Sequence, residues 1–195
     1  MLVNWWAVRR HHAGIEAATK PAVMIALIGV ATTADLDPTT LRPWIISALA
    51  FGLVGDIALL PQVDRFLAGL AAFFVGHVAY VVAFIVIWSP SAWLLAGTAG
   101  LAMLIWRFGV PIDRGLSGDP MRVPVLAYIA VIGALILTAS GTGRWPIVLG
   151  ALAFATSDGL IGTAKFVRPA PDRRVWILVL YHLGQGAIVA GAIVG

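Results

Sequence analysis

The stretch FLAGLAAFFVGHVAYVVAFIVIW, residues 66–88, decides the fold of this chain. It is apolar along its whole length apart from His77 and Tyr80, and no proline interrupts it. A helix needs roughly 17 to 25 mostly apolar residues to cross a lipid bilayer. Residues 66–88 are therefore expected to form a transmembrane helix.

The composition of the whole chain agrees with this reading. Of its 195 residues, 61% are hydrophobic and 11% are charged, whereas soluble domains carry about 25% charged residues. The absence of cysteine excludes disulfides, thiolate metal sites and a cysteine nucleophile. The net charge of +4 comes from cations beside apolar segments and not from a basic aromatic patch. The lipid bilayer is thus the expected partner, and nucleic acid is not.

Proline- and glycine-containing joints, with Pro111 among them, divide the chain into seven apolar runs. These runs cover approximately residues 21–34, 42–60, 66–88, 91–108, 122–140, 145–166 and 175–194. The first is the shortest, and Lys20 at its start can extend it by snorkelling. We predict an all-α, polytopic transmembrane helix bundle that forms one domain over residues 1–195, with residues 1–20 as a cytosolic leader.

The distribution of cations predicts the orientation. Placing the N-terminus on the cytosolic side leaves only Arg42 and Arg144 outside. The other eleven of the 13 cations then lie inside: Arg9, Arg10, Lys20, Arg65, Arg107, Arg114, Arg122, Lys165, Arg168, Arg173 and Arg174. Such a bias is typical of cytosolic loops and places the C-terminus outside. The arginine-, alanine- and glycine-rich composition suits a GC-rich bacterial genome, so we expect a multi-pass protein of the bacterial inner membrane.

A few polar residues fall inside the predicted spans, where an ionisable side chain costs roughly 2.5 to 3.5 kcal/mol and usually marks a site or a buried pair. The ionisable ones are Asp56, His77, Asp158 and His182, and they are accompanied by Tyr80, Tyr128, Ser157, Tyr181 and Gln185. Counting about 1.5 Å per residue from the inner surface places Asp56, Asp158, Gln185 and His77 in the inner half of the bilayer or near its midplane. The sequence therefore predicts one polar cavity that opens inward.

Several blocks of the chain resemble the YhhN family of lysoplasmalogenases. They are Lys20-Pro21, Gly55-Asp56-Ile-Ala-Leu-Leu60, residues 66–73, Gly76-His77-Val-Ala-Tyr80, Pro124-Val-Leu-Ala-Tyr128, Gly150-Ala-Leu-Ala-Phe154 with Ser157-Asp158, and Tyr181 with Gln185. The order and spacing of these blocks are similar to the family pattern over about residues 19 to 191. Members of that family look like eight-span proteins, and the usual first span is expected to be absent here.

The resemblance implies hydrolysis of the vinyl ether bond of a lysoplasmalogen, a lysophospholipid, to a fatty aldehyde and a glycerophospho-alcohol. Protonation of the β-carbon would form an oxocarbenium ion that water captures, so the reaction needs a carboxylic acid and no cofactor or metal. Hydrocarbon favours the protonated form of a carboxyl group. We expect Asp56 and Asp158 to be catalytic, with Asp158 as the acid and Asp56 as stabiliser or base. Lys20, His77, Tyr80, Tyr128, Ser157, Tyr181 and Gln185 are expected to bind or orient the substrate.

Other functions fit parts of the pattern. Paired intramembrane aspartates and histidines are also typical of proton-coupled transporters, and a lipid-binding membrane protein is another reading, although no inverted repeat is visible. A zinc hydrolase of the alkaline ceramidase kind would need both intramembrane histidines and both aspartates as ligands. A retinal protein is excluded by the lack of a lysine in mid-span. Lys20, Arg65 and Arg122 are candidates to bind the phosphate of the substrate, with membrane anchoring as the alternative role.

Overall fold

The computed structural model describes residues 1–36 and 38–194, and it confirms the predicted helix bundle. Within these residues the elements are α1 (Leu2–Arg9), α2 (Ala13–Thr33), α3 (Leu41–Ala58), α4 (Phe66–Val86), α5 (Trp93–Leu104), a π-helix (Ile105–Gly109), α6 (Val110–Gly115), α7 (Arg122–Ser140), α8 (Trp145–Phe166), a 3-10 turn (Pro171–Arg173) and α9 (Arg174–Ile193). Seven helical segments among the described residues are long and apolar enough to cross a membrane, with α5, the π-helix and α6 counting as one. The chain is a multi-pass membrane protein.

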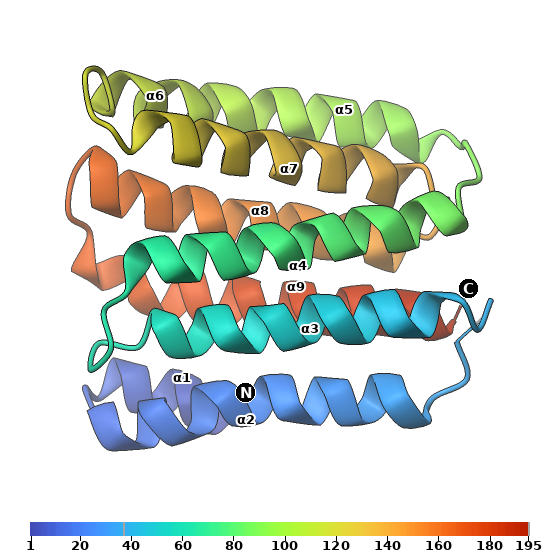
Figure 1. Ribbon diagram of the computed structural model, residues 1–195, viewed down its shortest axis with the longest axis horizontal. Helices are drawn as coiled ribbons and strands as arrows, with labels where there is room; N and C mark the ends of the chain where they lie inside the picture. The colour runs from blue at the N-terminus through green and yellow to red at the C-terminus, as the bar shows by residue number, and fades with distance from the viewer. Residues whose placement is uncertain (37, 195) are drawn as a thin grey trace.

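The seven long segments lie side by side along the long axis of the molecule (Figure 1). The α5–α6 segment and α7 form one edge, α1 and α2 form the opposite edge, and α3, α4, α8 and α9 lie between them. Chain reversals after α1, α3, α6 and α8 meet at one end of the bundle, on the left in Figure 1. We refer to this as the basic end, because it is the end that holds most of the cations.

Residues 1–20 do not form the simple leader that the sequence predicted. Residues 2–9 form α1, which buries Asn4 and packs against α2 and α9. The first long helix begins at Ala13 and not near residue 21. Polar residues lower the hydropathy of this segment, but they gain partners within the bundle: Thr19 accepts a hydrogen bond from Asn4, Glu16 pairs with Arg174, and Lys20 pairs with Asp56. Partnered polar groups are tolerated inside a bundle, so the helix continues through them.

The fourth span also runs further than predicted. Pro111 was expected to mark its end, yet the helix continues to Gly115 with a π-helical turn at Ile105–Gly109 just before the proline. Proline has no backbone N–H and its ring crowds the preceding turn, and a π turn is one way to accommodate both effects without ending the helix. The turn has a functional consequence, because its residues form part of a cavity wall described below.

Close contact between α8 and α9 depends on paired glycines. A Cβ atom at Gly150 would lie 2.7 Å from the carbonyl oxygen of Gly184 and 2.9 Å from the backbone nitrogen of Ile188. Neither backbone atom can move without separating the two helices. Small residues at such crossings let helix backbones approach closely.

We therefore expect Gly150→Ala to destabilise the bundle by about 1–3 kcal/mol, the usual effect of overpacking. The measurement is the midpoint of thermal unfolding in detergent. Gly29→Ala on α2 is the matched control, because a Cβ there meets no other group within 4 Å. Equal midpoints for the two variants would show that the α8–α9 contact is not as tight as described.

Candidate active site

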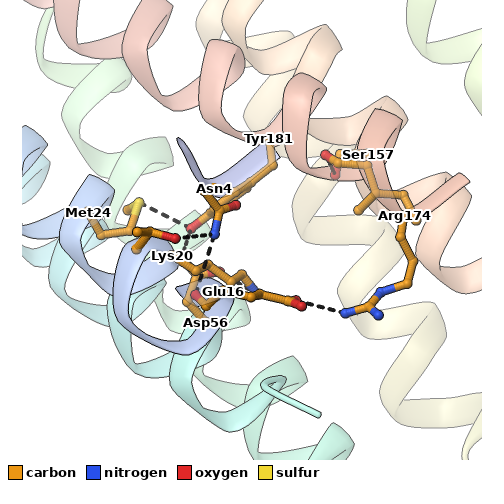
Figure 2. A network of polar contacts seen from close by, with 10 residues as sticks. Asn4, Glu16, Lys20, Met24, Asp56, Ser157, Arg174 and Tyr181 are labelled. Carbon is orange, nitrogen blue, oxygen red and sulfur yellow. Dashed lines mark hydrogen bonds and ion pairs between the residues drawn. The ribbon is translucent and has the colours of Figure 1, made fainter. Parts of the chain in front are cut away.

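The first polar cluster joins α2, α3 and α9. The Lys20 ammonium lies 3.1 Å from Asp56 Oδ1, and the Tyr181 hydroxyl donates a hydrogen bond to Asp56 Oδ2 at 2.9 Å. Figure 2 shows these three side chains meeting between the helices. The side chains of Lys20 and Asp56 are 10% and 1% exposed, so the ion pair is buried. Asp56 thus has a cation partner that its place in the sequence did not reveal.

The second polar cluster joins α4, α7 and α8. The Tyr128 hydroxyl donates to Asp158 Oδ2 at 2.6 Å, and His77 Nε2 lies 3.8 Å from the same oxygen. His77 Nδ1 is 2.5 Å from the carbonyl oxygen of Phe73, one turn earlier in α4. A carbonyl only accepts hydrogen bonds, so Nδ1 carries a proton. In the neutral ring Nε2 then presents a lone pair, and within the described residues it has no hydrogen-bond partner.

Tyr80 and Gln185 form a third contact, between α4 and α9. The Tyr80 hydroxyl donates to Gln185 Oε1 at 2.5 Å, and both side chains are buried. A Cβ at Gly52 would lie 3.5 Å from the Tyr181 hydroxyl and 3.6 Å from Gln185 Nε2. Gly52 of α3 therefore lies beside both polar groups, which places the Tyr80–Gln185 pair next to the first cluster.

Aromatic rings connect the clusters. Phe154 stacks on His77 with ring centroids 4.7 Å apart, and it lies 5.2 Å from the ring of Tyr181. Phe73 meets the rings of both Phe154 and Tyr181 edge-on. Packed aromatic rings thus lie between the two polar clusters. The prediction of one open polar cavity shared by Asp56 and Asp158 is wrong in that respect.

A cavity does reach one of the aspartates. It contains about 820 Å³ of empty space, a volume that includes the open solvent at its mouth. Asp158 and Tyr128 are the two polar side chains of its wall. The remaining wall residues are apolar and come from α3 to α8 and the π-helix: Leu59, Phe66, Leu70, Phe73, Leu101, Leu104, Ile105, Phe108, Gly109, Ile112, Val125, Ile129, Ile132, Ile136, Ala155, Gly159, Ile161, Gly162 and Phe166. Asp56 is not part of this wall.

Other sequence-predicted residues occupy places that the sequence did not indicate. Ser157 donates its hydroxyl to the carbonyl oxygen of Ile177 at 2.9 Å and so ties α8 to α9. Lys20 lies two turns into α2, where its side chain is 10% exposed and pairs with Asp56. Arg122 pairs with Asp113 at 2.8 Å. Three of the predicted binding residues thus make structural contacts.

Two residues with roles near the site were missed. Phe154 precedes Asp158 by four residues, and Met24, whose sulfur lies 3.3 Å from the Tyr181 hydroxyl, follows Lys20 by four. Residues four apart share a helix face. The four-residue spacing was therefore the sequence signal that could have identified Phe154 and Met24 as neighbours of the site.

The described residues provide no set of ligands for the zinc alternative. No group of three histidine, aspartate or glutamate side chains within residues 1–36 and 38–194 could hold a metal ion. His182 faces α1, where its Nδ1 accepts a hydrogen bond from Trp5 Nε1 at 2.9 Å. The two intramembrane histidines therefore belong to different contacts.

Comparisons with known proteins agree with the geometry. A lysoplasmalogenase of Mycobacterium tuberculosis is 27% identical to the chain over 197 residues, which cover 94% of this chain and 72% of the relative. Human lysoplasmalogenase TMEM86B is 32% identical over 153 residues, covering 75% of this chain and 62% of the human protein. No solved structure matches the chain significantly. The sequence profile of the YhhN family matches residues 15–192. Since this match includes all seven long helices almost entirely, the chain belongs to the YhhN family.

Proposed function

We propose that this protein hydrolyses the vinyl ether bond of lysoplasmalogens within the membrane, releasing a fatty aldehyde and a glycerophospho-alcohol. The observation that carries the proposal is the cavity wall, where Asp158 and Tyr128 interrupt an otherwise apolar surface. Such a wall suits a long alkenyl chain with one reactive bond held against a carboxyl group. The names of the mycobacterial and human relatives support the same activity.

The contacts of the two aspartates support different roles for them. Asp56 pairs with a buried lysine, whose positive charge attracts its carboxylate, whereas no lysine or arginine among the described residues pairs with Asp158. A carboxyl group in apolar surroundings without a cation favours its protonated form. We therefore assign Asp158 as the acid. Asp56 acts as a stabiliser through Tyr181 and the packed rings, and not as the base, because both of its carboxylate oxygens already have partners, Lys20 and Tyr181.

The reaction then follows from these positions. Asp158 donates its proton to the β-carbon of the vinyl ether, and the double-bond electrons form the new C–H bond, which leaves an oxocarbenium ion at the α-carbon. The Asp158 carboxylate and the Tyr128 hydroxyl remain beside this cation. Water adds to the α-carbon and loses a proton, giving a hemiacetal. The hemiacetal collapses to the aldehyde and the glycerol hydroxyl, so one water is consumed.

His77 is placed to hold that water. Its Nε2 lone pair and Asp158 Oδ2 are 3.8 Å apart, too far for a direct hydrogen bond, so a water that comes to lie beside Asp158 can contact both atoms. The water can donate a hydrogen bond to Nε2, which then accepts the proton that the water loses. His77 thereby supplies the base and can return the proton to Asp158 after the hemiacetal collapses.

Two substitutions of His77 test its two proposed roles, which are to hold the water and to accept the proton of the water. His77→Asn keeps a donor near the position of Nδ1 but removes the acceptor at Nε2, and we expect it to lower kcat by about a hundredfold, the lower range for a general base. His77→Gln places an amide oxygen near Nε2 and is expected to retain more of kcat, because the oxygen still holds the water. Both are measured as rates of aldehyde release. Full activity of both variants would remove His77 from the reaction.

The activity itself is tested with purified protein in detergent. We expect fatty aldehyde from 1-alkenyl-glycerophosphoethanolamine and no fatty acid from the 1-acyl analogue, because an ester lacks the nucleophilic β-carbon that accepts the proton. Chelators should leave the rate unchanged. Fatty acid release from the ester would instead indicate a lysophospholipase, and the absence of aldehyde would contradict the proposal.

The site lies towards the basic end of the bundle, which the charge bias supports as the cytosolic end. We infer that the N-terminus is cytosolic and the C-terminus lies outside, in the inner membrane of a bacterium, which the composition and the mycobacterial relative support. Residues 1–195 would act as a single domain. Cysteine substitutions in the loops at residues 60–65 and 88–92, tested with a membrane-impermeant thiol reagent, should label only the second loop in intact cells.

A further inference from the structure

Lys165 lies beside one end of the cavity. The Lys165 ammonium lies 5.1 Å from the centroid of the Phe66 ring. Phe66 begins α4 and Phe166 ends α8, and their rings meet edge-on with centroids 5.6 Å apart. Both phenylalanines belong to the cavity wall. The cavity wall therefore includes these two rings at the basic end of the bundle, and the exposed Lys165 lies beside them.

Three other cations near the cavity are engaged or wrongly placed for a ligand at this end, whereas Arg65, which directly precedes Phe66, is exposed there. Lys20 and Arg122 each pair with an aspartate. Arg107 lies at the depth of the reacting bond, because its neighbour Phe108 packs 2.6 Å from where a Cβ of Gly159 would be. Lys165, by contrast, forms no ion pair with any described carboxylate. Its charge is available to an anion at the cavity end.

The spacing along α8 matches the substrate. Lys165 follows Asp158 by seven residues, which is two turns on the same helix face and about 10.5 Å along the axis. In a lysoplasmalogen, seven bonds separate the β-carbon of the vinyl ether from the phosphorus atom. An extended chain spans about 8 Å over that many bonds. The contact of the β-carbon with Asp158 and the contact of the phosphate with Lys165 account for the remaining distance.

We propose that Lys165 binds the phosphate of the lysophospholipid and so sets the depth at which the vinyl ether stops beside Asp158. This rests on the function proposed above. With the phosphate at Lys165, the glycerol crosses the ring of Phe66, and the alkenyl chain continues past Asp158 towards Leu101 and Ile136 deeper in the cavity. The assigned ligand is a phosphodiester headgroup, and Lys165 is a specificity-determining residue for it.

Kinetics with two substrates test this assignment. For 1-alkenyl-glycerophosphoethanolamine, Lys165→Gln should raise KM about tenfold, as expected for loss of a charge-assisted contact, with kcat changed less than about twofold. For 1-alkenylglycerol, which lacks the phosphate, the same variant should behave like the unchanged protein. Lys165→Arg should restore KM. Arg168→Gln is the matched control, because it removes one exposed cation near the same end and controls for general attraction of anionic micelles.

A binding measurement separates failure of this inference from failure of the proposed function. The 1-O-alkyl analogue of the phospholipid has no vinyl ether and cannot be hydrolysed, so its affinity reports the phosphate contact alone. A tenfold loss of affinity in Lys165→Gln would support the inference even if no aldehyde is ever released. Unchanged affinity, an equal effect of Arg168→Gln, an equal effect on alkenylglycerol, or no binding by the unchanged protein would each overturn it.

Discussion

Asp158→Asn is expected to lower aldehyde release by about a hundred- to ten-thousandfold, the usual contribution of a general acid, while the bundle stays folded. The amide has nearly the shape of the carboxyl group but cannot donate a proton to carbon. Its oxygen can still accept the hydrogen bond from Tyr128, which Asp158 accepts at 2.6 Å. The measurement is aldehyde release per molecule of folded protein, with thermal unfolding as the check on structure.

Asp113→Asn is the matched control for this variant. Asp113 is a carboxylate near the same end of the bundle, but it pairs with Arg122 and is not part of the cavity wall. Its replacement should leave the rate nearly unchanged. Retention of full activity by Asp158→Asn would show that the acid is another group, and the mechanism would then be wrong.

Asp56→Asn is expected to have its largest effect on stability. The substitution leaves the Lys20 ammonium buried without a counter-charge, and breaking a buried ion pair in this way costs about 3–5 kcal/mol. From the sequence alone, Asp56 was expected to be a catalytic residue. The 3.1 Å contact with Lys20 changes that expectation, because both partners are buried. The measurement is the midpoint of thermal unfolding in detergent.

The double variant Lys20→Met with Asp56→Asn tests the cause. It removes both charges and replaces the lysine stem with an apolar chain of similar length, so we expect it to recover most of the lost stability. If Asp56 also acts as a stabiliser through Tyr181, activity should remain low in the refolded double variant. A single variant that melts like the unchanged protein would show that the ion pair contributes nothing to the fold.

Hydropathy predicted the seven long helices because insertion of a segment depends mainly on its own composition. The stretch at residues 66–88 and the helix α4 coincide to within two residues at either end. The errors occurred where tertiary contacts offset local polarity or proline chemistry. α2 extends back to Ala13 through three partnered polar residues, and the π turn carries the fourth span past Pro111.

The candidate site was predicted in its members but not in its arrangement. Asp158, Tyr128 and His77 come together as expected from their depths, and Asp56 contacts Tyr181. Ser157 and Lys20, by contrast, have structural partners. Depth in the bilayer follows from position along a helix, whereas the direction of a side chain depends on how each helix is rotated against its neighbours.

The sequence by itself determined that this chain crosses a membrane and which ionisable residues lie within its spans. The reason is that the free-energy cost of placing a group in hydrocarbon is a local property. Only the tertiary structure decided that Asp56 belongs to a buried ion pair while Asp158 faces an apolar cavity. The two aspartates lie at similar depths and carry the same chemistry. Their difference comes from partners on other helices, Lys20 for one and Tyr128 for the other, and such contacts exist only once the helices have packed.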